Sequence, residues 1–278
     1  MKKLETKSNG YVKFMIVQLR QYCLHQLRLF FIALQFFTRI PIPQWVGFDA
    51  NWLHQASRYF PVVGWVVGGV VSGVYVAASQ WWPNAVALVM SMAAGIWVTG
   101  AFHEDGFADV CDGFGGGVTP ERVLTIMKDS RIGAYGAIGI CLMLLFKFVL
   151  LVSLPMVLVV PAMLLAHALS RLLSCSLIWL LTYVKEDGKA KPLAQHMSSN
   201  DFGVACLSVV VPLGAILLWQ PVILERLLPA LILMSLAAFW FARLFVKRIG
   251  GYTGDCLGAV QQLTEVVFYL GLLAHVPS

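Results

Sequence analysis

Long apolar runs are the feature that most constrains this chain. Each run is close to the roughly 20 helical residues needed to cross ~30 Å of hydrocarbon. The predicted spans are residues 56–78, 84–102, 133–154, 157–183, 202–219, 227–246 and 255–275. Only 12% of the 278 residues are charged, about half the share in an average soluble domain. The chain is therefore predicted to be an all-α, polytopic membrane bundle with about seven transmembrane helices.

The N-terminal region is apolar but holds no run long enough to cross a membrane. Residues 25–39 are dense in apolar side chains, carry Arg28 and Arg39, and are followed by Pro41 and Pro43. A short segment of this kind lies in the membrane interface rather than across it. We predict an interfacial or re-entrant helix here, preceded by a cytoplasmic extension over residues 1–24. Residues 25–278 are predicted to form a single membrane-embedded domain.

Loops rich in basic residues alternate along the chain with loops that carry little or no positive charge. They gather before the first span and in the loops at residues 103–132, 184–201 and 247–254. The turns at 80–84 and 153–155 are uncharged, and the loop at 220–226 carries one acid and one base. The positive-inside rule places the N-terminus and the three basic loops in the cytoplasm, and leaves the C-terminus outside. Topology and anionic lipid account for the net charge of +6, so no nucleic-acid partner is predicted.

Four carboxylates lie within nine residues at the start of the first basic loop: Glu104, Asp105, Asp109 and Asp112. On a helix the three aspartates fall within roughly 60° of one another, with Glu104 about 100° to the side. The carboxylates of such a stripe repel one another unless a cation binds between them. A site made of oxygen ligands favours Mg²⁺, Mn²⁺ or Ca²⁺. We predict that these four residues bind the metal and that the aspartates are catalytic. The alternative is a solvated acidic helix end.

A glycine-rich run and a second polar motif follow on the same loop. Glycine at this density lets a backbone approach a ligand and offers N–H groups to phosphate oxygens. The next helix opens at Gly133, and its N-terminus is an expected anion site. The predicted substrate-binding residues here are Gly113, Gly115, Gly116, Lys128, Ser130 and Arg131. For the two basic residues the alternative is a role as topology anchors.

Polar residues inside the later spans form a third group. Asp255 starts the last span and is a predicted catalytic residue, as metal ligand or base. Gln262 and Glu265 lie deeper in that span, and Arg171 lies within the span at 157–183. Polar groups at such depth are costly and usually functional, so these three are predicted to bind substrate. The alternative is that Gln262 and Glu265 hydrogen-bond neighbouring helices. Lys147 is expected to reach the membrane surface and receives no role.

Clustered aspartates, cationic side chains and glycine-rich turns on one face suit phosphotransfer involving a pyrophosphate. Three segments in order, at 103–113, 127–136 and 251–259 with Gln262 and Glu265, resemble the cobalamin synthase (adenosylcobinamide-GDP ribazoletransferase) family. The early Phe37-Thr-Arg-Ile-Pro-Ile-Pro43 is similar to the same family, and the resemblance runs from about residue 30 to 270.

The resemblance implies a catalytic membrane domain that joins α-ribazole, or its 5′-phosphate, to adenosylcobinamide-GDP and releases GMP. It also implies Mg²⁺ dependence and a place in the bacterial inner membrane, with the active site cytoplasmic. Lys128, Arg131 and Arg171 would then steady the pyrophosphate. Membrane lipid is an expected partner. Homo-oligomers and association with other enzymes of late corrinoid synthesis are further expectations.

Two kinds of alternative function compete with this one. Another aspartate-rich membrane enzyme is disfavoured, because the chain lacks the arginine of the D-G-x₂-A-R pattern of CDP-alcohol phosphotransferases. The paired acidic motifs of prenyltransferases do not match either. A transporter or channel could use Asp105, Asp255 and Glu265 as an ion path, but its acids should lie at mid-membrane, often within repeats.

Overall fold

The computed structural model describes residues 2–47, 49, 51–184 and 195–274, without the side chains of residues 2–13. Over this part of the chain the regular elements are all helices, with one isolated β-bridge between Tyr183 and Tyr252, which confirms the predicted fold class. The helices are α1 (Lys2–Phe37), η1 (Gln44–Val46), α2 (Trp52–Ala56), η2 (Ser57–Tyr59), α3 (Phe60–Ala78), α4 (Asn84–Thr99), α5 (Phe102–Gly116), α6 (Pro120–Met127), α7 (Ala134–Ser153), α8 (Met156–Leu180), α9 (Ser199–Trp219), η3 (Pro221–Ile223), α10 (Leu224–Ile249) and α11 (Gly254–Leu273).

The membrane spans agree closely with those predicted from the apolar runs. Within the described residues, six helical segments are long and apolar enough to cross a membrane, and a bent pair of helices makes up to seven. The six are Trp52–Ala78, Ala134–Ser153, Met156–Leu180, Ser199–Trp219, Pro221–Ile249 and Gly254–Leu273. The predicted loop at 184–201 lies partly outside the described residues, since residues 185–194 are not described.

The predicted span at 84–102 differs from the structure. The chain turns by 88° between α4 and α5. Gly100 and Ala101 at this corner both have left-handed backbones, with φ of 67° and 59°. This conformation is easy for glycine and costly for other L-residues, so it stops the helix. The predicted loop at 103–132 is consequently not an open loop, because it contains α5 and α6.

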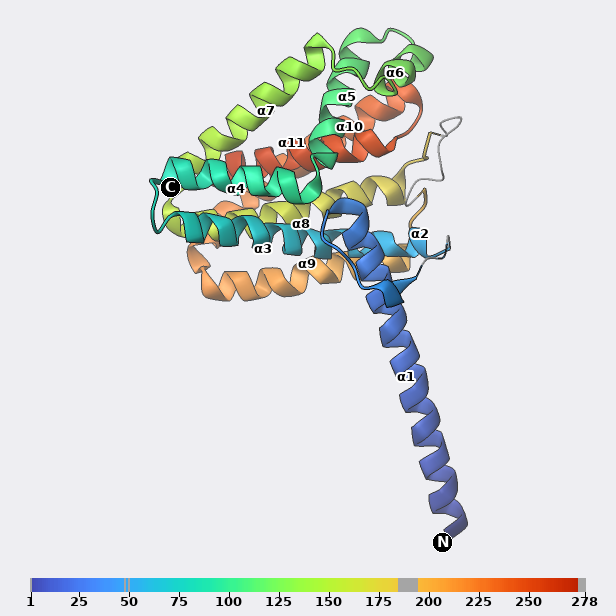
Figure 1. Ribbon diagram of the computed structural model, residues 1–278. Coiled ribbons are helices and arrows are strands. Elements are labelled where there is room, and N and C mark those ends of the chain that lie inside the picture. The colour runs from blue at the N-terminus through green and yellow to red at the C-terminus, as the bar shows by residue number, and fades with distance from the viewer. Residues whose placement is uncertain (1, 48, 50, 185–194, 275–278) are drawn as a thin grey trace.

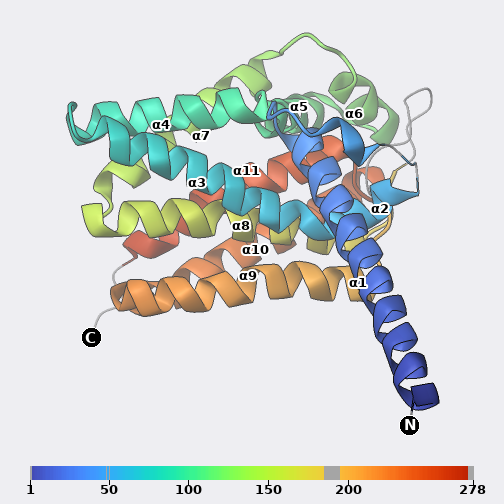
Figure 2. The same ribbon diagram turned by 60° about the horizontal axis from the view of Figure 1, so that its bottom comes forward.

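Helix α11 lies at the centre of the bundle and packs against α5, α7, α8 and α10. It is the most enclosed of the candidate spans in the described chain, with 72% of its most apolar window buried. Figures 1 and 2 show α3, α8 and α9 running alongside one another, with α4 packed against α3 and with α5 and α7 on the opposite side of the bundle. The polar side chains of Gln261, Gln262, Thr264 and Glu265 on α11 are therefore held inside protein rather than against lipid.

Helix α1 projects far from the bundle (Figure 1). Its side chains from Phe14 to Tyr22 are exposed, whereas Leu29, Ala33 and Phe37 are buried against the core. The predicted boundary between residues 24 and 25 falls inside this continuous helix. The division of the chain into an extension and a membrane-embedded domain stays a prediction.

Different segments of the chain lie at the two ends of the bundle. At one end Arg226 donates a 3.0 Å hydrogen bond to the carbonyl of Leu272, and the Tyr75 hydroxyl donates to Asn84 at 2.8 Å. Helix α1 joins the bundle at the opposite end, where α2, α5 and α6 also lie (Figure 1). All three motifs of the predicted site belong to this second end, since α5, the loop after α6 and the start of α11 meet there.

Candidate functional site

Helix α5 carries the acidic motif and contacts the segments that carry the other two motifs. Its buried face includes His103, Gly106 and Val110, which pack toward α11. Asp105 lies on the exposed side, and Asp109 is half-buried. The helix thus separates Glu104, which lines an internal cavity, from the aspartate stripe. This agrees with the angular offset expected from helix geometry.

Asp112 binds the first turn of α7 at the far end of the stripe. Its two carboxylate oxygens accept hydrogen bonds from the backbone N–H groups of Gly133, at 2.7 Å, and Gly136, at 2.8 Å. A Cβ at either glycine would collide with this carboxylate. The N-terminus of α7 does bind an anion as predicted, but the anion is Asp112. This role explains the burial of Asp112, and its predicted metal and catalytic roles stay predictions.

The glycine run forms the last turns of α5. A Cβ on Gly113 would lie 2.5 Å from Met127 Cγ, and one on Gly115 would lie 2.7 Å from the Tyr135 ring. The missing side chains therefore let α6 and α7 pack closely on α5. Gly116 is exposed at the rim of a surface groove. Phosphate binding by Gly113, Gly115 and Gly116 stays a prediction.

The second motif forms an exposed turn between α6 and α7. Arg131 Nη2 lies 2.7 Å from Asp129 Oδ2, and both residues line the surface groove. The hydrogen bonds from Arg131 lower the pKa of the Asp129 carboxyl to about 2. Lys128 and Ser130 are exposed on the same turn without lining the groove. An incoming phosphate would therefore compete with Asp129 for Arg131.

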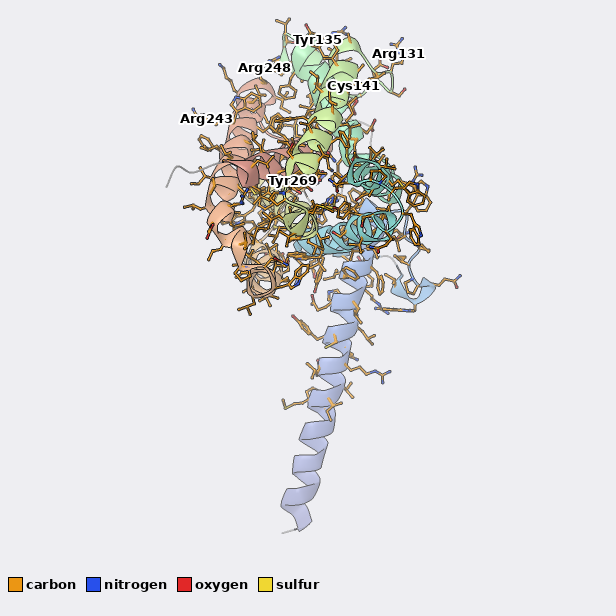
Figure 3. The ribbon with its side chains drawn as sticks, turned by 90° about the vertical axis from the view of Figure 1, so that its left-hand side faces the viewer. Arg131, Tyr135, Cys141, Arg243, Arg248 and Tyr269 are labelled. Carbon is orange, nitrogen blue, oxygen red and sulfur yellow. The ribbon has the colours of Figure 1, made fainter. Side chains whose placement is uncertain are left out.

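Two arginines outside the predicted set lie at this end of the bundle. Arg122 lines the groove. Arg248 Nη2 donates a 2.5 Å hydrogen bond to the Gly117 carbonyl and so ties α10 to the end of α5. Figure 3 shows Arg131, Tyr135 and Arg248 gathered at the same end of the molecule. In the sequence, the positive charge of the predicted loops was the one signal that pointed to Arg122 and Arg248.

The third motif meets α5 through closely packed glycines. A Cβ on Gly106 would lie 3.0 Å from Asp255 Cα, and one on Gly258 would lie 3.2 Å from the His103 carbonyl oxygen. Thr253 caps α11 by accepting from the backbone N–H of Cys256, which places Asp255 in the first turn. Asp109 lies three residues beyond Gly106 on α5. The structure therefore brings the acidic motif and Asp255 to one place.

Deeper in the bundle, Gln262 connects the same two helices. Its Nε2 donates a 3.0 Å hydrogen bond to Glu104 Oε1. The other oxygen, Glu104 Oε2, is buried and has no partner among the described residues. The alternative of inter-helix hydrogen bonding therefore describes Gln262 in this structure, while Glu104 keeps an unused acceptor.

Glu265 is the centre of a buried ionic cluster. It pairs with Lys147 of α7 and lies 3.3 Å from His167 Nδ1 of α8. Gln261 donates to it at 2.7 Å, and the Tyr269 hydroxyl at 3.3 Å. Lys147 is only 8% exposed, so the expectation that it reaches the membrane surface is wrong, because it is held by Glu265. In the sequence, the signal for this ion pair was the presence of one acid and one base, Glu265 and Lys147, within otherwise apolar spans.

Arg171 lies beside this cluster and is 2% exposed. Its Nη1 donates to the carbonyl of His167 at 3.0 Å, and its Nε has no acceptor among the described residues. It lines two internal cavities, one beside Glu104 and one lined by aromatic side chains. The structure thus places Arg171 inside the bundle beside two cavities, and its predicted role in binding substrate stays a prediction.

The acidic residues have the donor chemistry of a Mg²⁺ site. They are hard oxygen donors, and Glu104 offers a buried oxygen that is otherwise unused. Within the described chain, no three His, Cys, Asp or Glu side chains converge tightly enough to form a metal cage. Mg²⁺ at phosphoryl-transfer sites needs only one or two carboxylates when substrate phosphates complete its shell. The residues present therefore fit a site that the substrate completes.

Comparisons with known proteins agree on one family. The family model described as cobalamin-5-phosphate synthase matches residues 29–273. The adenosylcobinamide-GDP ribazoletransferase of Leptothrix cholodnii is 48% identical over 260 residues, covering 91% of this chain and 97% of that protein. The protein of the same name from Shewanella frigidimarina is 46% identical over 257 residues, covering 90% and 96%. No solved structure matches the chain.

Proposed function

The chain belongs to the cobalamin-5-phosphate synthase family, and from this premise we propose how its side chains perform the reaction of an adenosylcobinamide-GDP ribazoletransferase. The reaction joins α-ribazole, or its 5′-phosphate, to adenosylcobinamide-GDP and releases GMP. The resemblance predicted from three short motifs is thereby confirmed. The relatives are named for a transfer reaction and not for transport, which disfavours the ion-path alternative.

The observation that carries the assignment of residues is the convergence of three motifs on α5. Asp112 binds the start of α7, and Gly106 packs against Asp255. Acids from two helices and cations from the groove consequently share one end of the bundle. Such an arrangement can bind a charged pyrophosphate and position an attacking hydroxyl beside a carboxylate.

We assign Asp105 and Asp109 as the residues that would hold Mg²⁺, while the metal role of Glu104, which lines the internal cavity on another side of α5, stays a prediction. Bound there, the ion would neutralise charge on the phosphate oxygens as the bond to the leaving group breaks. Asp112 orients α7 and the groove through its two backbone hydrogen bonds. Arg131 and Arg122 would bind the pyrophosphate of adenosylcobinamide-GDP, with Lys128 and Ser130 on the same turn as Arg131.

Asp255 is assigned as the general base. A ring hydroxyl of the ribose, which is free in both α-ribazole and its 5′-phosphate, attacks the phosphorus attached to the cobinamide arm, and its proton passes to the Asp255 carboxylate. An oxygen–phosphorus bond forms to ribazole while the bond from that phosphorus to the GMP oxygen breaks. Gly106 lets α11 approach closely enough for this acid to lie beside the aspartate stripe.

Turnover of Asp109→Asn in nanodiscs tests the assignment. We expect Mg²⁺-dependent release of GMP to fall at least about 100-fold, because the variant loses one of the two carboxylates that would hold the ion. Asp49→Asn is the matched control, since Asp49 lies in the loop before α2 and outside the three motifs. Full turnover by Asp109→Asn would overturn the metal assignment. A wild-type protein that released no GMP would overturn the reaction itself.

We also propose the bacterial inner membrane as the location, with the N-terminus and the three motifs in the cytoplasm. The support is the alternation of basic and uncharged loops, together with the gathering of the three motifs at one end of the bundle. Fusions after residue 273 distinguish the two orientations. An active alkaline phosphatase and a dark fluorescent protein are expected there, and the reverse result would invert the topology.

A further inference from the structure

A second cavity lies beside the start of α11, and aromatic side chains dominate its lining. Half of the described residues that line it are Phe or Tyr: Phe36, Phe37, Phe60, Phe102, Tyr183 and Tyr252. Those from the ends of α1, α3 and α5 pack edge to face, with Phe37 and Phe60 ring centroids 4.5 Å apart. The cavity thus lies where the ends of α1, α3 and α5 meet α8 and α11.

The position of this cavity relates it to the proposed general base. Gly254 and Gly258 line it, and Asp255 follows Gly254 directly. A nucleoside whose base occupied the cavity would leave its sugar at the first turn of α11. The cavity has an empty volume of about 540 Å³ with its open mouth included.

The lining discriminates between the aromatic parts of the two substrates. Guanine presents several donors and acceptors on its edge, and burying them without partners is costly. The ribazole base is a fused, largely apolar ring with one free acceptor nitrogen. Arg171 lines the cavity and has a buried Nε–H without an acceptor among the described residues. That donor can pair with the free acceptor nitrogen of the ribazole base.

Tyr252 strengthens the apolar character of the cavity. It is fully buried, and burial raises the pKa of its hydroxyl above the ordinary value. Its ring packs edge-on against Tyr183 at a centroid distance of 5.6 Å. The pair therefore stays neutral and presents ring surface rather than charge.

We infer that this aromatic cavity binds the heteroaromatic base of ribazole, stacked on aromatic rings from the ends of α1 and α5. The inference rests on the proposed function for the identity of the nucleoside. It adds a binding site for the attacking substrate that is separate from the groove at Arg131. Bound there, the nucleoside directs its hydroxyl toward Asp255.

Phe36 gives the test, because it is 40% exposed and its replacement leaves the buried core intact. In Phe36→Ala we expect the KM for α-ribazole to rise at least about fivefold, the effect of losing one base–aromatic stack. The KM for adenosylcobinamide-GDP and the kcat should stay within about twofold. Phe36→Tyr should restore the wild-type KM, whereas Phe36→Leu should not.

Phe146→Ala is the matched control, since Phe146 is 43% exposed on α7 and does not line this cavity. Equilibrium dialysis of α-ribazole alone against each variant separates the cavity from the reaction. Retention by wild type and loss in Phe36→Ala would support the inference even if no GMP were released, a result that would remove the proposed function alone. An unchanged KM for α-ribazole in an active Phe36→Ala enzyme, or unchanged retention, would overturn the inference.

Discussion

The buried cluster around Glu265 and the turn before α7, where Asp112 and Asp129 form their bonds, both pair carboxylates with donors, but in different surroundings. Glu265 is fully buried and has partners from α7, α8 and α11. Asp129 lies on the surface and interacts with the neighbouring Arg131. Asp112 is intermediate, being buried but bound to backbone N–H groups.

The difference shows which acids remain available for chemistry. Glu265 already receives several hydrogen bonds and a counter-charge, so it stabilises the packing of three helices. The Asp129–Arg131 pair is exposed to water and salt, which weaken it. A substrate phosphate can therefore displace the surface pair far more easily than the buried one.

Lys147→Met gives the largest expected change in stability. Removing one partner of a buried ion pair leaves an uncompensated charge, which typically costs about 3–5 kcal/mol of the free energy of unfolding. Lys147→Met with Glu265→Gln should recover part of that loss, because no unpaired charge remains. Equilibrium unfolding in detergent micelles measures both. Lys247→Met, at an exposed lysine of α10, is the control. Equal losses for Lys147→Met and Lys247→Met would end the distinction between the two regions.

Gly136→Ala should have an intermediate effect. The added Cβ would collide with the Asp112 carboxylate and weaken its hold on α7, a change that typically costs about 1–3 kcal/mol. Gly73→Ala is the matched control, since nothing lies within 4 Å of its added Cβ. That control should be neutral or slightly stabilising, because alanine favours helix. Similar melting temperatures for the two variants would mean that Asp112 does not cap α7.

Asp129→Asn should have the smallest effect. Because its folded-state pKa is lowered from 3.8 to about 2, the pair contributes stability above about pH 4 and loses it as the pH falls toward about 2. The small difference in melting temperature between wild type and variant should therefore be constant from pH 8 to pH 5. High salt should reduce it. A difference that vanished between pH 7 and pH 5 would contradict the lowered pKa.

Hydropathy predicted most of the fold because a span must be long and apolar wherever its neighbours lie. The predicted 133–154 and 157–183 nearly coincide with α7 and α8. The corner at Gly100 and Ala101 was missed because an apolar run continues through it. A left-handed backbone at Ala101 depends on tertiary packing rather than on its own preference.

The candidate site was predicted to the level of motifs but not of partners. The acidic motif is visible in the sequence because its members are close together. The pairing of Lys147 with Glu265 is not, since it depends on how α7 and α11 are rotated toward each other. Hydropathy carries no information on that rotation. The same limit applies to the aromatic cavity, whose residues come from five separate segments.

The corner between α4 and α5 also determines the depth of the acidic motif. Helix α4 has 16 residues and is therefore about 24 Å long, shorter than the ~30 Å hydrocarbon layer. If α4 begins at one surface of the bilayer, the chain turns before it reaches the other. Glu104 and Asp105 would then lie below the headgroups, where charges interact more strongly than in water. The enzyme would draw the phosphates of a water-soluble nucleotide down to the level of the lipid chains.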